Sequence, residues 1–251
     1  AQICKDLNEL TIFEISKDLS GLISLIDAQR NLKRVEISHN RNKIGTYKEL
    51  GKAISRKSNT IIYLYLASIS IIPPSFLTSF VNLKVLSIYN NNIHYINHKI
   101  ENYEDTSEEI KYLQQYLAIS EFPDLEYLEV EGLSCFKELA MLIEKTNGNI
   151  LEIIVSSYDK NAKNTGMLIK AIANNCPKIK KLDIHLEHKD LVHLKLLLLN
   201  CKQLTRLRFR SYLTASIMNE NGDELLDILT KFSPNSLTEI IIDDHWEYST
   251  N

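Results

Sequence analysis

The chain has 251 residues, a formal net charge of −3 and a hydrophobic content of 44%. Its 7 glycines and 5 prolines argue against a collagen-like or a disordered chain, and it lacks the basic excess of a nucleic-acid-binding protein. No run approaches the ~18 consecutive apolar residues that mark a membrane span. We therefore expect neither a nucleic-acid nor a membrane partner. The chain also has no Asn-x-Ser/Thr glycosylation acceptor, and its four cysteines follow no disulfide spacing, which together favour a location in the cytoplasm or nucleus.

One short apolar pattern recurs along the whole chain. It is Leu-x-x-Leu-x-Leu, with Ile, Val or Phe allowed at each apolar place. Nine copies begin at Leu7, Leu32, Ile61, Leu83, Leu125, Ile150, Ile179, Leu204 and Leu237. Their mean spacing of about 29 residues lies at the upper end of the range for leucine-rich repeats. The pattern predicts a single leucine-rich-repeat domain over residues 1–251.

Each copy predicts a short strand, because its second and third apolar residues alternate with polar ones. Between copies the apolar period changes to that of a helix. Three sets of residues each share one helical face: Ile110, Leu113 and Leu117; Phe136, Leu139, Ala140 and Ile143; and Leu168, Ile169, Ile172 and Ala173. The fold predicted is an α/β solenoid of about nine repeats, shaped as a horseshoe. Its parallel sheet would line the concave side, and its helices the convex side.

The spacing is broken once, by a gap of 42 residues between the copies at Leu83 and Leu125. This gap holds an asparagine-rich and then acidic stretch, which predicts a loop insertion around residues 90–108. Insertions in solenoids map to loops and often lie on the binding face. A binding loop and a merely tolerated surface loop both remain open.

Helix starts and cysteines fit the same repeat. Thr46 with Glu49, Thr106 with Glu109 and Asn221 with Glu224 have the spacing of capping boxes. Cys4, Cys176 and Cys201 each lie three residues before the first apolar position of a copy. We expect them to be small buried side chains and reduced thiols, and Cys135 to be structural as well.

Catalytic and metal-binding motifs are not found. The chain has no glycine-rich phosphate loop, nucleophile elbow or zinc-protease helix. His94 and His98 are four residues apart but have no third ligand at a recognisable spacing, and His185, His188 and His193 form only a loose group. We expect no enzyme activity, no metal and no cofactor.

Strand alternation places the third, fifth and seventh residues of each copy on the concave face, where a protein partner would bind. Tyrosine and arginine are enriched at interface hot spots, and both gather at these positions. The residues predicted to contact a partner are Tyr63, Tyr65, Tyr89, Tyr127, Lys181, Asp183, His185, Arg206, Arg208 and Arg210. The three arginines share one strand face, which predicts an acidic partner segment there. Two alternatives stay open: aromatic residues favour strands in any case, and the arginines could simply pair with Asp183, Glu239 and Asp243.

Two segments carry a family resemblance. Residues 19–35, with the sequence LSGLISLIDAQRNLKRV, and residues 175–184, with the sequence NCPKIKKLDI, resemble the repeats of fungal F-box/leucine-rich-repeat proteins. The resemblance implies the substrate-recognition region of an SCF-type ubiquitin ligase receptor. No F-box precedes Leu7, so we expect that domain upstream in the full protein.

Two other functions fit the same repeat. One is the sensor or inhibitor region of another multidomain protein, such as an immune-type receptor or a ribonuclease inhibitor. The other is a repeat-built regulator of a GTPase, which would accelerate hydrolysis through an exposed arginine or asparagine.

Overall fold

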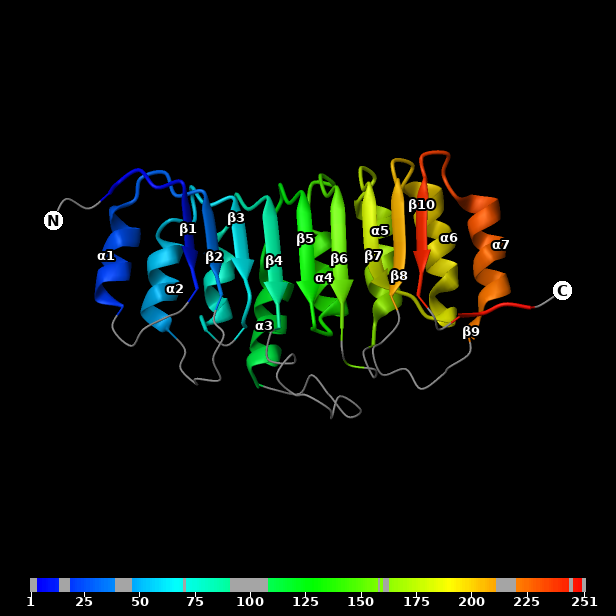
Figure 1. Ribbon diagram of the computed structural model, residues 1–251, viewed down its shortest axis with the longest axis horizontal. Coiled ribbons are helices and arrows are strands. Elements are labelled where there is room, and N and C mark those ends of the chain that lie inside the picture. Colours follow the sequence, from blue (N-terminus) through cyan, green and yellow to red (C-terminus); the bar gives the residue numbers. More distant parts are fainter. Residues whose placement is uncertain are drawn as a thin grey trace.

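The structure is a computed structural model, and it describes residues 4–13, 19–38, 47–69, 71–90, 108–157, 159, 163–210, 220–243 and 246–249. Strands and helices alternate along an elongated stack, with β1 near one end and α7 at the other (Figure 1). Nine strands form one sheet in chain order, and every neighbouring pair is parallel. They are β1 (Glu9–Ile12), β2 (Arg34–Ile37), β3 (Tyr63–Leu66), β4 (Val85–Tyr89), β5 (Tyr127–Glu131), β6 (Glu152–Ser156), β7 (Lys181–His185), β8 (Arg206–Arg210) and β10 (Glu239–Ile242). Each predicted copy of the repeat therefore supplies one strand of the sheet.

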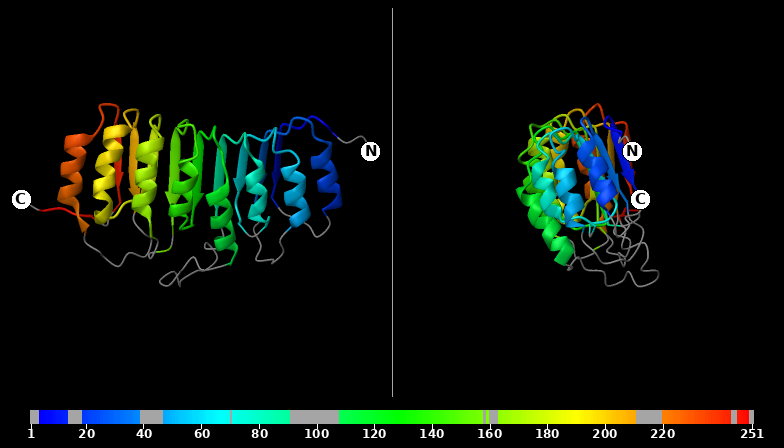
Figure 2. Two further views of the ribbon diagram at one scale, coloured as in Figure 1. Left: turned by 180° about the vertical axis from the view of Figure 1, so that it is seen from behind. Right: turned by 90° about the vertical axis from the view of Figure 1, so that its left-hand side faces the viewer.

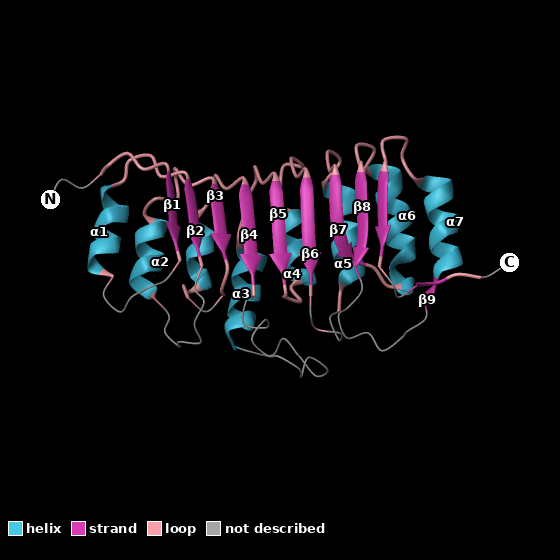
Figure 3. Ribbon diagram, in the orientation of Figure 1, coloured by secondary structure: helices cyan, strands magenta, loops and turns pink. Residues whose placement is uncertain are grey.

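The helices form a second layer on one side of this sheet (Figures 2 and 3). They are α1 (Ser20–Ala28), α2 (Lys48–Ser55), α3 (Glu108–Ile119), α4 (Phe136–Ile143), α5 (Thr165–Asn175), α6 (Leu191–Asn200) and α7 (Gly222–Phe232), with the 3-10 helices η1 (Pro74–Ser79) and η4 (His188–Asp190). No described helix covers the other side of the sheet, which we call the open sheet face. Two short strands, β9 (Glu220–Asn221) and β11 (Trp246–Glu247), form a separate parallel pair that the repeat pattern did not predict.

The core lies between the two layers, where the second and third apolar residues of each copy meet the helices. Leu128 and Val130 of β5 are fully buried, and the register aligns Leu128 with Leu86 on one side and Ile153 on the other. Rows of equivalent residues thus stack from strand to strand, as a solenoid requires. The helical faces predicted for α3, α4 and α5 are all buried, which confirms the periodicity assignment.

The cysteine prediction is correct for three residues and wrong for one. Cys135, Cys176 and Cys201 are buried, and the Cys201 thiol donates to the Cys176 carbonyl oxygen of the preceding repeat at 3.6 Å. Burial raises the pKa of Cys201 to about 12. Cys4 is exposed, because among the described residues no earlier repeat packs over the first one. The equivalent position of the second repeat is Gln29, which is buried and donates to the Cys4 carbonyl oxygen at 2.7 Å.

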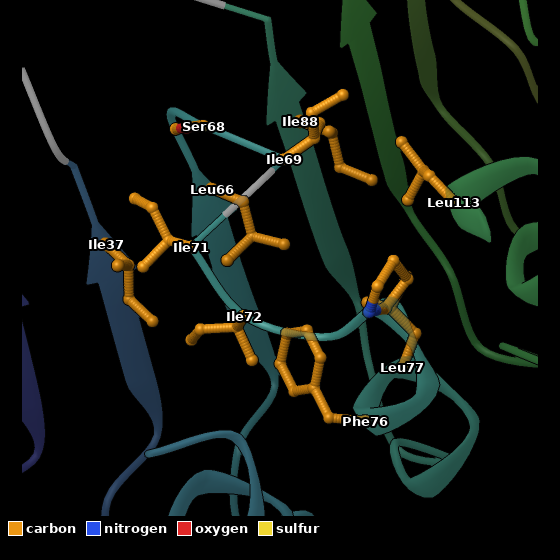
Figure 4. Close-up of a pocket in the computed structure, with 11 residues that line it drawn as sticks. Ile37, Leu66, Ser68, Ile69, Ile71, Ile72, Phe76, Leu77, Ile88 and Leu113 are labelled. Carbon is orange, nitrogen blue, oxygen red and sulfur yellow. The ribbon is translucent and has the colours of Figure 1, made fainter. Parts of the chain in front are cut away.

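The third interval departs from the expected strand-and-helix unit. It is the shortest, with 22 residues between Ile61 and Leu83, and the 3-10 helix η1 replaces an α-helix there. Under η1 the packing leaves a cavity of about 10 Å³ between the sheet and the helices (Figure 4). Its lining is mainly apolar and includes Leu66, Ile88 and Phe76. A space of this size holds about one water molecule, so it cannot be a ligand site.

Several sequence predictions lie outside the described residues. These include the insertion over residues 91–107 with His94 and His98, and the capping residues Thr46 and Thr106. The side chain of Asn221, the third capping residue, is not described either.

Candidate functional site

Four tyrosines predicted to bind a partner come together on the open sheet face. Tyr63 and Tyr65 belong to β3, Tyr89 to β4 and Tyr127 to β5, and all four are partly buried. The rings of Tyr65 and Tyr89 are in contact, with centroids 5.2 Å apart and planes tilted by 41°. Adjacent strands thus join residues that lie up to 64 positions apart in the sequence into one aromatic surface.

Glu129 lies among these tyrosines on β5. The register places it opposite Ser87 of β4, and it is the next outward-facing residue after Tyr127 on the same strand. Its side chain is partly buried. Burial first, and then the neighbouring Glu129 carboxylate, raise the pKa of Tyr89 and Tyr127 above its ordinary value of 10.0. Both hydroxyls therefore stay protonated beside the carboxylate.

At the edge of the tyrosine cluster a cation is already bound from within the chain. The guanidinium of Arg34 on β2 lies over the ring of Tyr63, with its central carbon 3.6 Å from the centroid. The same guanidinium donates to Glu36 from Nε at 2.9 Å and from Nη2 at 2.6 Å. A cation is thus held here by an aromatic face and a carboxylate together.

The three arginines of β8 each pair with an acidic residue. Arg206 lies 3.3 Å from Glu239, and Arg208 lies 3.4 Å from Asp243. These two pairs confirm part of the alternative that the sequence left open.

Arg210 donates two hydrogen bonds to Asp183, of 2.6 and 2.8 Å, which is the third of the acidic pairs that the sequence left open. It also lies 3.2 Å from Glu131, which the sequence did not indicate. Burial raises the pKa of Glu131, while the positive charge of Arg210 lowers it. Arg210 belongs to β8 and Glu131 to β5, so the contact passes over the ends of β6 and β7. Ser156 and His185 occupy that row and are buried, which leaves room for the long arginine.

His185 was predicted to face a partner, and this prediction is wrong. Only 2% of it is exposed. Its Nε2 accepts a hydrogen bond from the Ser157 backbone N–H at 3.0 Å, and its Nδ1 lies 3.1 Å from the Arg210 carbonyl oxygen. The imidazole also packs edge-on against the Phe136 ring. Burial lowers the pKa of His185 from 6.5 to about 4, so it is neutral, with Nε2 accepting and Nδ1–H donating.

Other outward positions also differ from the expected map. Ala67, Ser87 and Ser156 occupy third, fifth or seventh places, yet each is buried. Their side chains are too short to rise above their larger neighbours on the sheet. Lys181 is exposed as expected, and it pairs with Glu152 at 3.2 Å.

Two depressions lie on the helical side instead, on either side of η1. One has a volume of about 540 Å³ and is lined by residues that include Lys48, Lys52 and Arg56 of the α2 region. Lys52 pairs with Glu49 and Arg56 with Asp27, both on the exposed surface. These depressions follow from the short 3-10 helix, because it fills less of the layer than an α-helix would.

No protein-family model matches the chain, and no curated protein matches it either. Within the described ranges, no helix has the length and apolar character needed to cross a membrane. The same ranges contain no group of three or more histidine, cysteine or acidic side chains placed to hold a metal ion.

Proposed function

We propose that this chain is the leucine-rich-repeat region of a protein-binding protein, and that its partner docks on the open sheet face. The observation that carries this proposal is the cluster of Tyr63, Tyr65, Tyr89 and Tyr127 at the centre of a nine-stranded sheet that no described helix covers on that side. Tyrosine contributes large contact area at low entropic cost, which is why it is enriched at hot spots. A rigid sheet also presents these side chains with little rearrangement.

We further propose that the protein is an F-box-type substrate receptor of an SCF-type ubiquitin ligase, acting in the cytoplasm or nucleus. The support is the repeat itself, with nine copies of Leu-x-x-Leu-x-Leu and the cysteine-containing segment around Cys176 that resembles such proteins. None of the four cysteines forms a disulfide, which is compatible with a reducing compartment. In this proposal the F-box would recruit the ligase, and the sheet would hold the substrate.

The test is affinity capture with the intact protein, followed by mass spectrometry. Two matched double variants separate the faces: Tyr65→Ala/Tyr89→Ala on the sheet, and Met167→Ala/Val192→Ala on the exposed side of α5 and α6. We expect the wild type and the helix-side variant to retain the same partner together with ligase subunits, and the sheet variant to lose the partner only. Retention of the partner by the folded sheet variant would refute docking on the open sheet face, and loss of the partner by the helix-side variant would indicate docking on the helices instead. A GTPase as partner, with faster hydrolysis, would refute the ligase assignment.

A further inference from the structure

The centre of the open sheet face combines four tyrosines with one carboxylate. We call Tyr63, Tyr65, Tyr89, Tyr127 and Glu129 the tyrosine–glutamate patch. It spans three adjacent strands, β3, β4 and β5. Ser87 lies at its middle, opposite Tyr65 on one strand and Glu129 on the other, and is only 2% exposed. The short serine side chain lets the surrounding tyrosines and the glutamate form one continuous surface.

The charge of this patch is not balanced from within the described chain. Glu131 has Arg210 as a partner, and Glu152 has Lys181. Glu129, by contrast, forms no ion pair with any described residue, and the neutral hydroxyls of Tyr89 and Tyr127 lie near it. A carboxylate has about four acceptor positions, so Glu129 can accept hydrogen bonds from an incoming donor.

On the β2 side of the patch, Arg34 is already held by the Tyr63 ring and by Glu36, and on the other side the sheet supplies no cation. The outward-facing positions of β4, β5 and β6 carry three glutamates, and no lysine or arginine. An incoming positive group would therefore meet aromatic faces and an unneutralised carboxylate. An incoming acidic group would meet net negative charge, which opposes association.

The chain itself shows what kind of group such a surface holds. One strand away, Arg34 lies over the Tyr63 ring and donates to Glu36. That arrangement joins an aromatic face and a carboxylate to one guanidinium. The surface around Tyr65, Tyr89 and Glu129 repeats the aromatic face and the carboxylate, and the cation is the missing component.

We infer that the tyrosine–glutamate patch binds a basic side chain, arginine or lysine, that a partner protein presents to the open sheet face. This inference rests on the proposed function, since it names the chemistry of the partner at the same face. It differs from the acidic segment expected from the arginines of β8. Because those arginines are already paired with carboxylates, an acidic partner would have to displace them. At Tyr65, Tyr89 and Glu129 no described ion pair has to be broken, whereas the Tyr63 ring already holds Arg34.

The experiment uses random 12-residue peptides displayed on phage, selected against the immobilised full chain. We expect the selected peptides to be enriched in arginine or lysine, and one is then synthesised and titrated by calorimetry. Glu129→Gln keeps the shape and an acceptor oxygen but removes the charge, and it should weaken the peptide at least tenfold. Tyr65→Leu removes an aromatic face and should weaken it at least fivefold. Glu239→Gln, at the far strand β10, is the matched control and should change the affinity less than twofold.

A second comparison changes the peptide instead of the protein. Replacing its arginine by citrulline keeps the hydrogen-bonding shape and removes the charge, so binding to the wild type should fall at least tenfold. Binding to Glu129→Gln should fall much less, because the charge on the receptor is already gone. Circular dichroism melting of each variant confirms folding before titration.

The outcomes separate this inference from the proposed function. Enrichment of acidic peptides, absence of any basic enrichment, or undiminished binding to Glu129→Gln overturns the inference. If binding survives Glu129→Gln but is lost in Tyr65→Leu, the claim that the partner presents a basic side chain is wrong, while docking on the open sheet face still stands. The proposal of docking on this face fails only if the partner captured with the intact protein binds the folded Tyr65→Ala/Tyr89→Ala variant as well as it binds the wild type.

Discussion

Acidification should destabilise the fold through the buried His185. Its pKa is lowered from 6.5 to about 4, because burial disfavours the imidazolium and because Nε2 must stay unprotonated to accept from Ser157 N–H. Below pH 6.5 the unfolded chain binds a proton at this residue that the folded chain does not bind, so stability falls with pH. The loss levels off only below pH 4, where the folded chain binds the proton as well. From these two pKa values, the linkage relation gives about 2 kcal/mol lost between pH 7 and pH 5, with about 3 kcal/mol as the full effect.

Chemical denaturation of the wild type and of His185→Gln at pH 7 and pH 5 measures this effect. Glutamine offers an acceptor and a donor but does not titrate. Between the two pH values, we expect the wild type to lose about 2 kcal/mol more than the variant. All other titrating groups are common to both proteins and cancel in the comparison. Parallel losses in the two proteins would mean that the folded chain protonates His185 freely, and the description of a buried neutral imidazole would be wrong.

Three further predictions concern the core, the sheet face and the thiols. Leu182→Ala should cost about 2–5 kcal/mol of unfolding free energy, whereas the neighbouring Lys181→Ala should cost at most about 1 kcal/mol, since only the leucine is buried; equal melting shifts would contradict the register. Arg210→Ala should cost about 1–3 kcal/mol in urea denaturation, because it leaves two partly buried carboxylates without their cation, and unchanged stability would argue against these pairs. In the native state a thiol reagent should modify Cys4 quickly and Cys201 only on unfolding; equal rates would contradict the burial of Cys201.

The strand positions, their order and the inward-facing residues were predictable from the sequence. A strand in a solenoid is determined by local alternation, and Leu128 and Val130 of β5 carry that signal within four residues. Each unit packs only on its neighbours, so a repeated pattern also fixes which strands are adjacent. The same reasoning offered pairing with acidic neighbours as one alternative for the β8 arginines. Arg206 and Glu239 do meet at equal repeat positions, but Arg208 and Arg210 each pair with a residue one outward position out of register.

Only the tertiary structure shows the contacts that join side chains from different repeats. The strand pattern placed His185 outward, but a bond to the Ser157 backbone and a contact with Phe136 of α4 draw it inward. Burial of that row in turn lets Arg210 reach Glu131 three strands away. The role of Glu129 depends on the tyrosines of β4 and β5 that lie near it. Apolar periodicity records which side of a strand is buried, but side-chain length and cross-strand hydrogen bonding determine which outward residues stay free, and those are fixed only when the strands are packed together.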